Sequence, residues 1–248
     1  MKNLMWEFEW QNIKFCDLSI KLNFFRRASA EFYSAFYEEL FSRYKGYDDL
    51  PKIWQENKFE TAREISKLLN DQMKIMSIGC GLGYIERSLV NLNSEINIDA
   101  YDFSLIATKW LEKIQRVEVI HELIEEKKYD FIFCTQLLYA LSDKEIKDLA
   151  ILLKSLLEDG SIFMTVDASA NNTENGYSVN KESLVEHIKN ILRHYYYLLF
   201  VKRHKAQFWG WQRDNQEIIK IFTDNGFFVQ RKYSAVGQSF LIFTNNKT

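Results

Sequence analysis

The clearest chemical signature in the chain is a glycine loop, Gly79-Cys80-Gly81-Leu82-Gly83. It follows a short apolar run, Ile75 to Ile78, and a helical pattern begins directly after it at Tyr84. Glycines between a buried strand and a helix N-terminus let the backbone turn sharply and approach a ligand, with free N–H groups facing the crevice. Asp102 ends the next apolar run, where its carboxylate is placed to accept hydrogen bonds from a ribose diol. Together these residues predict a βαβ unit that binds a nucleoside.

The spacing of the glycines indicates which nucleoside. The dinucleotide fingerprint G-x-G-x-x-G would place its last small residue at Tyr84, which is too large for close helix packing and for a pyrophosphate. The G-x-G-x-G spacing fits a ligand without phosphates better, while a turn whose glycines serve packing alone is the open alternative. On these motifs the chain resembles the class I S-adenosylmethionine-dependent methyltransferases, which carry G-x-G-x-G after strand one and an acid at the end of strand two. The resemblance covers roughly residues 50 to 245.

The resemblance implies an α/β, Rossmann-like fold with a seven-stranded, mostly parallel sheet and an antiparallel last strand. Residues 1–50 are expected to form an N-terminal helical lid, and residues 51–248 the methyltransferase domain. A helical, substrate-side insertion is expected after strand five, at about residues 168–213. The patterns predict these strands: Ile75–Ile78, Ile96–Asp102, Val117–Ile120, a strand opening at Tyr129-Asp130, Ser161–Asp167, and a hairpin of Phe227–Tyr233 with Gln238–Thr244. They predict these helices: one from about Ala28, then Lys52–Asn70, one from Tyr84, Leu105–Gln115, Asp143–Leu157, Lys181–Val201 and Asp214–Asn225.

The family pattern also implies a set of residues that bind the methyl donor. Asp102 would accept from both ribose hydroxyls, Phe103 would flank the adenine, and Glu122 would accept from the adenine amino group. Thr135 and Gln136, at the end of strand four, would lie beside the sulfonium. The full donor-binding set is Gly79, Cys80, Gly81, Gly83, Glu86, Asp102, Phe103, Ser104, Glu122, Thr135 and Gln136. Ser104 also reads as a helix N-cap, which makes its role mainly structural.

One position departs from the family pattern. Many class I methyltransferases carry an acid two residues before the first glycine, and this chain has Ser77 there. Glu86, in the first turn of the following helix, is the candidate to replace that charge. The alternative is that Glu86 only complements the helix dipole. On the preceding helix, Trp54 is expected in the core and Lys58 in solvent, although their four-residue spacing lets both reach the site.

Two regions are candidates for the acceptor site. Tyr33 and Tyr37 belong to an aromatic helical stripe that is mainly core by its spacing. The cluster Lys202-Arg203-His204-Lys205 with Gln207 to Arg213 has the form of an anion site beside a flat surface, or of a solvated basic turn with two packed tryptophans. Candidate substrate-binding residues are Tyr33, Tyr37, Arg203, Trp209, Trp211 and Arg213. An alcohol or phenol acceptor would need a base such as His204, His194 or Tyr195, whereas a phosphate, phosphoramidate or carboxylate oxygen needs none.

Composition limits the class of protein. The chain has 248 residues, 47% apolar content and a net charge of −2, which fits one large α/β domain and argues against a nucleic-acid-coating protein. Its three cysteines have no metal or disulfide spacing, so we expect no metal site and a reducing cytoplasm. The N-terminus lacks a signal-peptide core and no run is long enough to span a membrane. Monomer and homodimer both remain open.

The sequence thus predicts an O-methyltransferase acting on a small, anionic acceptor, with S-adenosylmethionine as donor and S-adenosylhomocysteine as product. The aromatic helix and the Phe-Trp-Gly-Trp-Gln-Arg element also resemble methyltransferases of bacterial capsule and surface-glycan pathways, which implies a phosphoramidate, phosphate or sugar-nucleotide acceptor. The open alternatives are an N-methyltransferase of a small amine or sugar and a catalytically silent donor-binding protein. Nucleic-acid and protein methyltransferases are disfavoured because no N/D-P-P-Y/F motif follows strand four.

Overall fold

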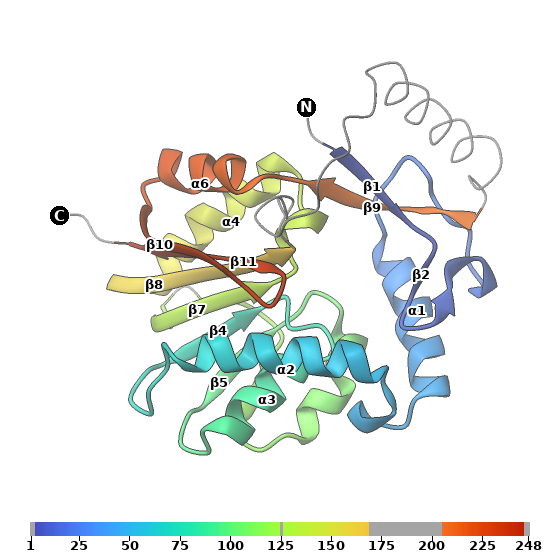
Figure 1. The fold of residues 1–248 in the computed structure, drawn as a ribbon, viewed down its shortest axis with the longest axis horizontal. Helices are drawn as coiled ribbons and strands as arrows, with labels where there is room; N and C mark the ends of the chain where they lie inside the picture. The colour runs from blue at the N-terminus through green and yellow to red at the C-terminus, as the bar shows by residue number, and fades with distance from the viewer. Residues whose placement is uncertain (1–2, 125, 169–204, 246–248) are drawn as a thin grey trace, which may run out of the picture.

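The computed structural model describes residues 3–124, 126–168 and 205–245, and its centre is a seven-stranded sheet (Figure 1). The strands are β4 (Ile75–Ile78), β5 (Ile98–Tyr101), β6 (Val117–Ile120), β7 (Tyr129–Thr135), β8 (Leu157–Ala168), β10 (Phe228–Ala235) and β11 (Gln238–Thr244). Their order is β10-β11-β8-β7-β4-β5-β6. Strands β4 to β8 pair in parallel, and β11 is antiparallel to both of its neighbours. The predicted fold class is confirmed.

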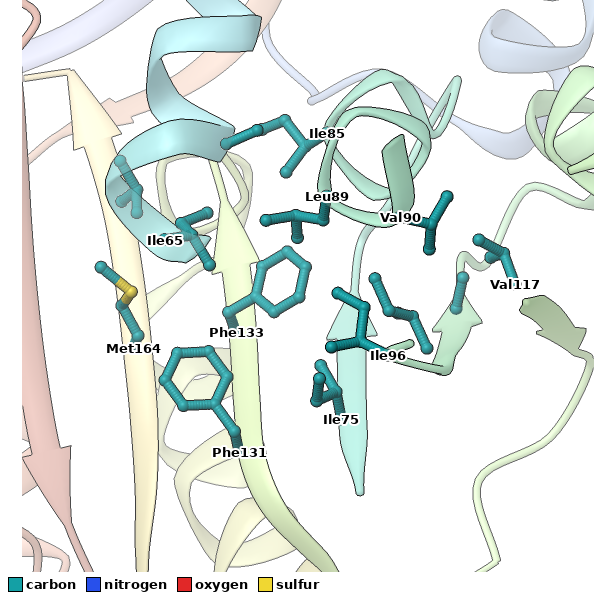
Figure 2. Close-up of a cluster of buried hydrophobic side chains, with 14 of the residues drawn as sticks. Ile65, Ile75, Ile85, Leu89, Val90, Ile96, Val117, Phe131, Phe133 and Met164 are labelled. Carbon is teal, nitrogen blue, oxygen red and sulfur yellow. The ribbon is translucent and has the colours of Figure 1, made fainter. Parts of the chain in front are cut away.

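Helices cover both faces of the sheet. They are α2 (Lys52–Ser66), α3 (Tyr84–Leu92), α4 (Asp143–Leu156) and α6 (Asn215–Asp224). Side chains of α2 and α3 pack with those of β4, β5, β7 and β8 in one buried cluster, part of which Figure 2 shows around Phe131 and Phe133. The clusters of α4 and α6 fill the other face. None of the described helices is long and apolar enough to cross a membrane.

Two predicted elements change. Residues Leu105–Lys113 form a 3-10 helix, η3, instead of an α-helix. The Thr108 hydroxyl donates 2.8 Å to the carbonyl of Leu105 within it, a local bond that competes with the α-helical pattern. The predicted turn before strand five lies inside β8, because Leu157 already pairs with Tyr129 of β7. The predicted helix Lys181–Val201 falls outside the described residues.

The segment of residues 3–50 differs from the expected helical lid. It begins with strands β1 (Asn3–Glu7), β2 (Glu9–Trp10) and β3 (Ile13–Lys14), and only then reaches helix α1 (Ala30–Arg43). Strand β1 pairs antiparallel with β9 (Gln207–Gln212), as Figure 1 shows at the edge of the molecule. The alternation of aromatic and acidic residues from Trp6 to Trp10 has a period of two, which fits a strand better than a helix.

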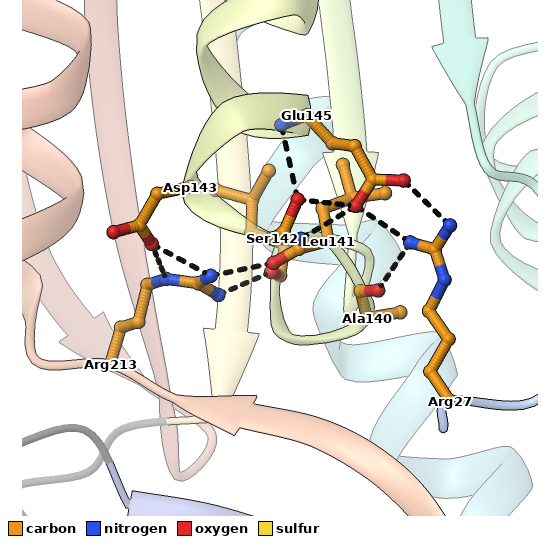
Figure 3. Close-up of polar contacts among 8 residues, drawn as sticks. Arg27, Ala140, Leu141, Ser142, Asp143, Glu145 and Arg213 are labelled. Atoms are coloured by element: carbon orange, nitrogen blue, oxygen red, sulfur yellow. Dashed lines mark hydrogen bonds and ion pairs between the residues drawn. The ribbon is translucent and has the colours of Figure 1, made fainter. Parts of the chain in front are cut away.

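Strand β9 lies directly on the short helix η4 (Leu138–Ala140), which follows β7. Gly210 makes this approach possible: its φ is +153°, and a Cβ there would lie 2.0 Å from the carbonyl oxygen of Tyr139. Two arginines hold the same turn (Figure 3). Arg27 donates to the carbonyl of Ala140 at 3.0 Å and pairs with Glu145 at 2.6 Å. The residue 3–50 segment is therefore attached to the carboxyl edge of the central sheet.

Candidate functional site

A cleft opens at the carboxyl ends of β4, β5 and β7, with about 830 Å³ of empty space including its mouth. Parallel sheets place ligands at this edge, because the loops that leave neighbouring strands diverge there. The cleft is lined by Trp10, Tyr33, Tyr37, Trp54, Lys58, Gly79, Cys80, Gly81, Leu82, Gly83, Tyr84, Ile85, Asp102, Phe103, Thr135, Gln136, Leu137, Tyr139, Ala140 and Trp209. Most of the predicted donor-binding residues therefore meet in one place.

The glycine loop forms the floor of the cleft, but its amides are already used. Gly79 N donates to the carbonyl of Tyr101 at 2.8 Å, and Gly81 N donates to Asp102 Oδ2 at 2.8 Å. The N–H groups of Cys80 and Gly83 are also bonded within the protein. The expected row of free amides is therefore wrong for these four positions. The loop instead offers a close, flat surface, which suits a ligand without a pyrophosphate.

Asp102 follows the end of β5 and faces this loop. Its Oδ1 accepts from the N–H of Ser104 at 2.9 Å and its Oδ2 from Gly81, so each oxygen keeps a lone pair for a ligand. Burial raises the pKa of Asp102, and the two backbone hydrogen bonds oppose that shift. The Phe103 ring stands 57% exposed at the mouth of the cleft, edge-on to Tyr33. Ser104 is at the N-cap of η3 without a side-chain capping bond.

Glu86 projects from the first turn of α3 onto Ser77 of β4. The Ser77 hydroxyl donates a hydrogen bond to Glu86 Oε1, while Oε2 is buried without a hydrogen-bond partner among the described residues. Burial raises the pKa of Glu86 to about 7. A helix-dipole role alone would leave such a side chain in solvent, whereas this one is 1% exposed. The carboxylate thus lies beside the position where the family pattern has its acid.

Lys58 reaches the cleft from α2, contrary to the expectation of a solvent-exposed side chain. Its Nζ donates to Gln136 Oε1 at 2.9 Å, beyond the end of β7. Burial lowers the pKa of Lys58 to about 8, and the charges of Glu86 and Asp167 oppose that shift. Trp54, one turn away on the same helix, also lines the cleft and packs edge-on against Tyr84. The sequence signal for both was their four-residue spacing on one helix.

Aromatic side chains close the cleft on the side of residues 3–50. Tyr33 and Tyr37 come from α1, and Trp209 comes from β9. Burial raises the pKa of Tyr33 to about 12 and also raises that of Tyr37 well above its ordinary value, so both phenols stay neutral. Trp209 is 7% exposed and stacks at 6.2 Å on Tyr139, a lining residue that the sequence analysis did not single out. These rings form an apolar wall on this side of the cleft.

Other predicted residues lie away from the cleft. Glu122 is exposed in the loop after β6 and does not line it. Trp211 does not line the cleft, and its ring packs edge-on to Phe208. Arg213 donates to the carbonyls of Leu138 at 2.8 Å and Leu141 at 2.6 Å and to Asp143 at 3.0 Å (Figure 3). With its guanidinium so engaged and only 6% of the residue exposed, Arg213 supports the η4 turn.

Four residues predicted to bind the acceptor or to act as a base fall outside the described ranges. The four are His194, Tyr195, Arg203 and His204. The sequence predicted no metal site. Within residues 3–124, 126–168 and 205–245, no three His, Cys, Asp or Glu side chains are grouped to hold a metal ion.

Comparisons with known proteins agree with this geometry. A family model described as a methyltransferase domain matches residues 53–227. Magnesium protoporphyrin IX methyltransferase from Synechocystis PCC 6803, solved with bound SAH, is similar with a TM-score of 0.58 and 16% identity, covering 86% of this chain and 97% of that one. Human N-acetylserotonin methyltransferase in complex with SAM is similar with a TM-score of 0.57 and 12% sequence identity. The match covers 88% of this chain and 57% of the human one. CalO1, a methyltransferase of calicheamicin biosynthesis solved in its SAH-bound form, is similar with a TM-score of 0.56 and 13% sequence identity. The match covers 87% of this chain and 58% of CalO1.

The chain therefore spans little more than half the length of the human enzyme and of CalO1. At these identities the structural likeness concerns the fold. No curated protein matches the chain by sequence.

Proposed function

Since the chain belongs to the class I S-adenosylmethionine-dependent methyltransferases, we propose that it transfers a methyl group to an oxygen atom of a small acceptor. S-adenosylmethionine is the cofactor, and when bound it supplies an electrophilic methyl group. The observation that carries the proposal is the pairing of Glu86 with Ser77. The buried carboxylate replaces, from the helix, the charge that the strand position lacks.

The residues of the cleft fit this cofactor. Asp102 keeps one lone pair on each oxygen, which suits the two hydroxyls of a ribose, and the exposed Phe103 ring offers a face to a base. Glu86 does not itself line the cleft, but its unpartnered Oε2 suits an ammonium group, and the ammonium of Lys58, which does line it, suits a carboxylate. We propose these four as the donor-binding groups, with Thr135 and Gln136 beside the reacting methyl.

The protein's contribution to the reaction is alignment and exclusion of water. In-line transfer requires the acceptor oxygen, the methyl carbon and the leaving atom to be held in one line. The apolar wall of Tyr33, Tyr37 and Trp209 keeps water from competing as the acceptor.

The acceptor that we propose differs in one respect from the one expected from the sequence. An anionic acceptor was inferred from the basic cluster, and a capsule or surface-glycan pathway from the resemblance of the aromatic helix and the Phe-Trp-Gly-Trp-Gln-Arg element. The Arg213 guanidinium, however, is engaged with Asp143 and two carbonyls. Arg203 lies outside the described residues, so the anionic acceptor and that pathway now depend on Arg203 and its neighbours. Methylation of an oxygen remains the proposed reaction.

Calorimetric titration tests the proposed cofactor. S-adenosylhomocysteine should bind with measurable heat, and NAD should not, because the loop amides that a pyrophosphate would need are bonded internally. Heat from NAD, or its absence with S-adenosylhomocysteine, would refute the assignment.

Replacing Glu86 with glutamine should weaken S-adenosylhomocysteine binding and stabilise the free protein at alkaline pH. Loss of one charge-assisted hydrogen bond to the ligand ammonium corresponds to about a tenfold weaker affinity. The pKa of Glu86 is raised from 4.5 to about 7 by burial, so the stability contributed by its neutral form is complete below about pH 4.5 and is lost as the pH rises through about 7. E86Q stays neutral and should gain ~1–3 kcal/mol over the wild type at pH 8.

Thermal unfolding at pH 4.5 and pH 8, with titrations at pH 8, measures both effects. The exposed Glu112→Gln is the control for removing a carboxylate. A stability difference that does not grow with pH, together with unchanged affinity, would show that Glu86 has neither role.

A further inference from the structure

A second cavity lies behind Tyr139, next to the cofactor cleft. Tyr139 lines both spaces, and the second has about 440 Å³ of empty space including its mouth. The cavity is lined mainly by apolar or aromatic residues, and its polar lining residues are Asp167 at the end of β8, Gln212 and Arg213, whose guanidinium is already bonded to Asp143 and two carbonyls. A flat, largely apolar molecule with one polar group matches this lining.

Asp167 has an unused hydrogen-bond acceptor. Thr165 Oγ1 donates to its Oδ2 at 2.5 Å, while Oδ1 is buried without a partner among the described residues. A buried carboxylate oxygen without a donor carries a desolvation cost, which a ligand hydroxyl or amine would remove. Within the described ranges no ion pair to Asp167 is formed, and Arg213 pairs with Asp143.

Two charged groups act on Asp167 through space, Lys58 of α2 and Arg213 after β9. Burial raises the pKa of Asp167 to about 6, although the Thr165 hydroxyl, the backbone of Leu138 and the charges of Arg213 and Lys58 oppose that shift. Tyr139 of η4 and Cys134 of β7 also face it, and burial keeps both of these neutral by raising their pKa values. Near neutral pH the side chain is therefore a carboxylate able to accept a proton.

We propose that this cavity binds the methyl acceptor as a flat, apolar molecule with a neutral hydroxyl group, and that Asp167 is the catalytic base that receives the hydroxyl proton. The inference depends on the proposed function and specifies its substrate class. It assigns the base to a residue other than His194, Tyr195 and His204. An anionic oxygen would instead meet the negative charge of the Asp167 carboxylate, which Arg213 and Lys58 offset without cancelling the effect of burial.

The transfer step balances without another reactant. The acceptor oxygen forms a bond to the methyl carbon, the carbon–sulfur bond breaks, and its electron pair goes to sulfur. The hydroxyl proton goes to Asp167 Oδ1 and leaves to solvent after the product departs. The charge of the sulfonium is lost in the same step, so the site ends with a neutral carboxylic acid and a neutral thioether.

Binding of 4-nitrophenol to the protein saturated with S-adenosylhomocysteine tests the proposal. The phenolate of this probe absorbs visible light and the neutral phenol does not, so its absorbance reports the pKa of the bound hydroxyl. Next to Asp167 the neutral form is favoured. We expect the pKa of the bound probe to be higher by about one unit or more in the wild type than in D167N. Phenyl phosphate, with the same ring and an anionic group, should not displace the probe.

The variant Asp130→Asn is the matched control. Asp130 is also a carboxylate, and it accepts a hydrogen bond from the N–H of Lys74, but it lies near the start of β7, whereas Asp167 lies near the end of the parallel strand β8. The variant should leave the probe pKa at the wild-type value. Titration of D167N with S-adenosylhomocysteine shows separately that the variant folds and that the cofactor assignment holds. Equal probe pKa values in wild type and D167N, displacement by phenyl phosphate, or no probe binding at millimolar concentration would each overturn the acceptor proposal while leaving the cofactor assignment intact.

Discussion

Replacement of Asp102 with alanine is expected to weaken S-adenosylhomocysteine binding by about 100-fold or more. The side chain is proposed to accept two charge-assisted hydrogen bonds from the ribose, each contributing ~1.5–3 kcal/mol, and 1.4 kcal/mol corresponds to a factor of ten. It also holds the N–H groups of Gly81 and Ser104, so its loss loosens the floor of the cleft. Isothermal titration of the variant against the wild type measures the effect.

Glu122→Ala is the matched control for this variant. Glu122 was predicted to bind the adenine, but it is exposed and does not line the cleft, so its removal should leave the affinity unchanged. If D102A and E122A lose affinity equally, or if neither does, the proposed position of the ribose is wrong.

Gly210→Ala is expected to destabilise the protein by about 3 kcal/mol, which lowers Tm by ~6–12 °C, and to reduce cofactor binding. The new Cβ would lie 2.0 Å from the carbonyl oxygen of Tyr139, and backbone atoms cannot move aside as a flexible side chain can. Strand β9 would have to separate from η4, which displaces Tyr139 and Trp209 from the cleft wall. Thermal unfolding and titration with S-adenosylhomocysteine report the two effects.

Gly237→Ala separates the steric clash from backbone strain. Gly237 has φ +70° in the β10–β11 turn, and no atom lies within 4 Å of the added Cβ. This variant should lose only about 1 kcal/mol and keep full cofactor affinity. Similar losses in both variants would mean that contact with Tyr139 is not what requires glycine at position 210.

The sequence was sufficient to predict those parts of the structure whose signal lies within a few neighbouring residues. The glycine loop, β6 and the start of α4 follow patterns contained within a few residues, and Ser142 caps α4 through reciprocal bonds with Glu145, only three positions away. The same holds for the approach of Asp102 to the loop, because parallel neighbouring strands end at one edge.

Residues with distant partners were the ones misplaced. Arg213 looked like an anion-binding residue because its sequence neighbours are basic and aromatic, whereas its partners at Leu138, Leu141 and Asp143 lie about 70 positions earlier. The burial of Lys58 depends on Gln136, 78 positions along the chain. Hydrophobic periodicity identifies the face of a helix, but it does not identify what that face meets.

The pairing of β1 with β9 has a consequence for biosynthesis. Trp6 and Phe208 are register partners about 200 positions apart, and a ribosome adds roughly 5–20 residues per second. The segment from Asn3 to Glu7 therefore waits on the order of 10–40 s for its partner strand to emerge. Throughout that interval its backbone donors and acceptors are open to other nascent or misfolded chains, so a chaperone that shields this stretch would raise the yield of native enzyme.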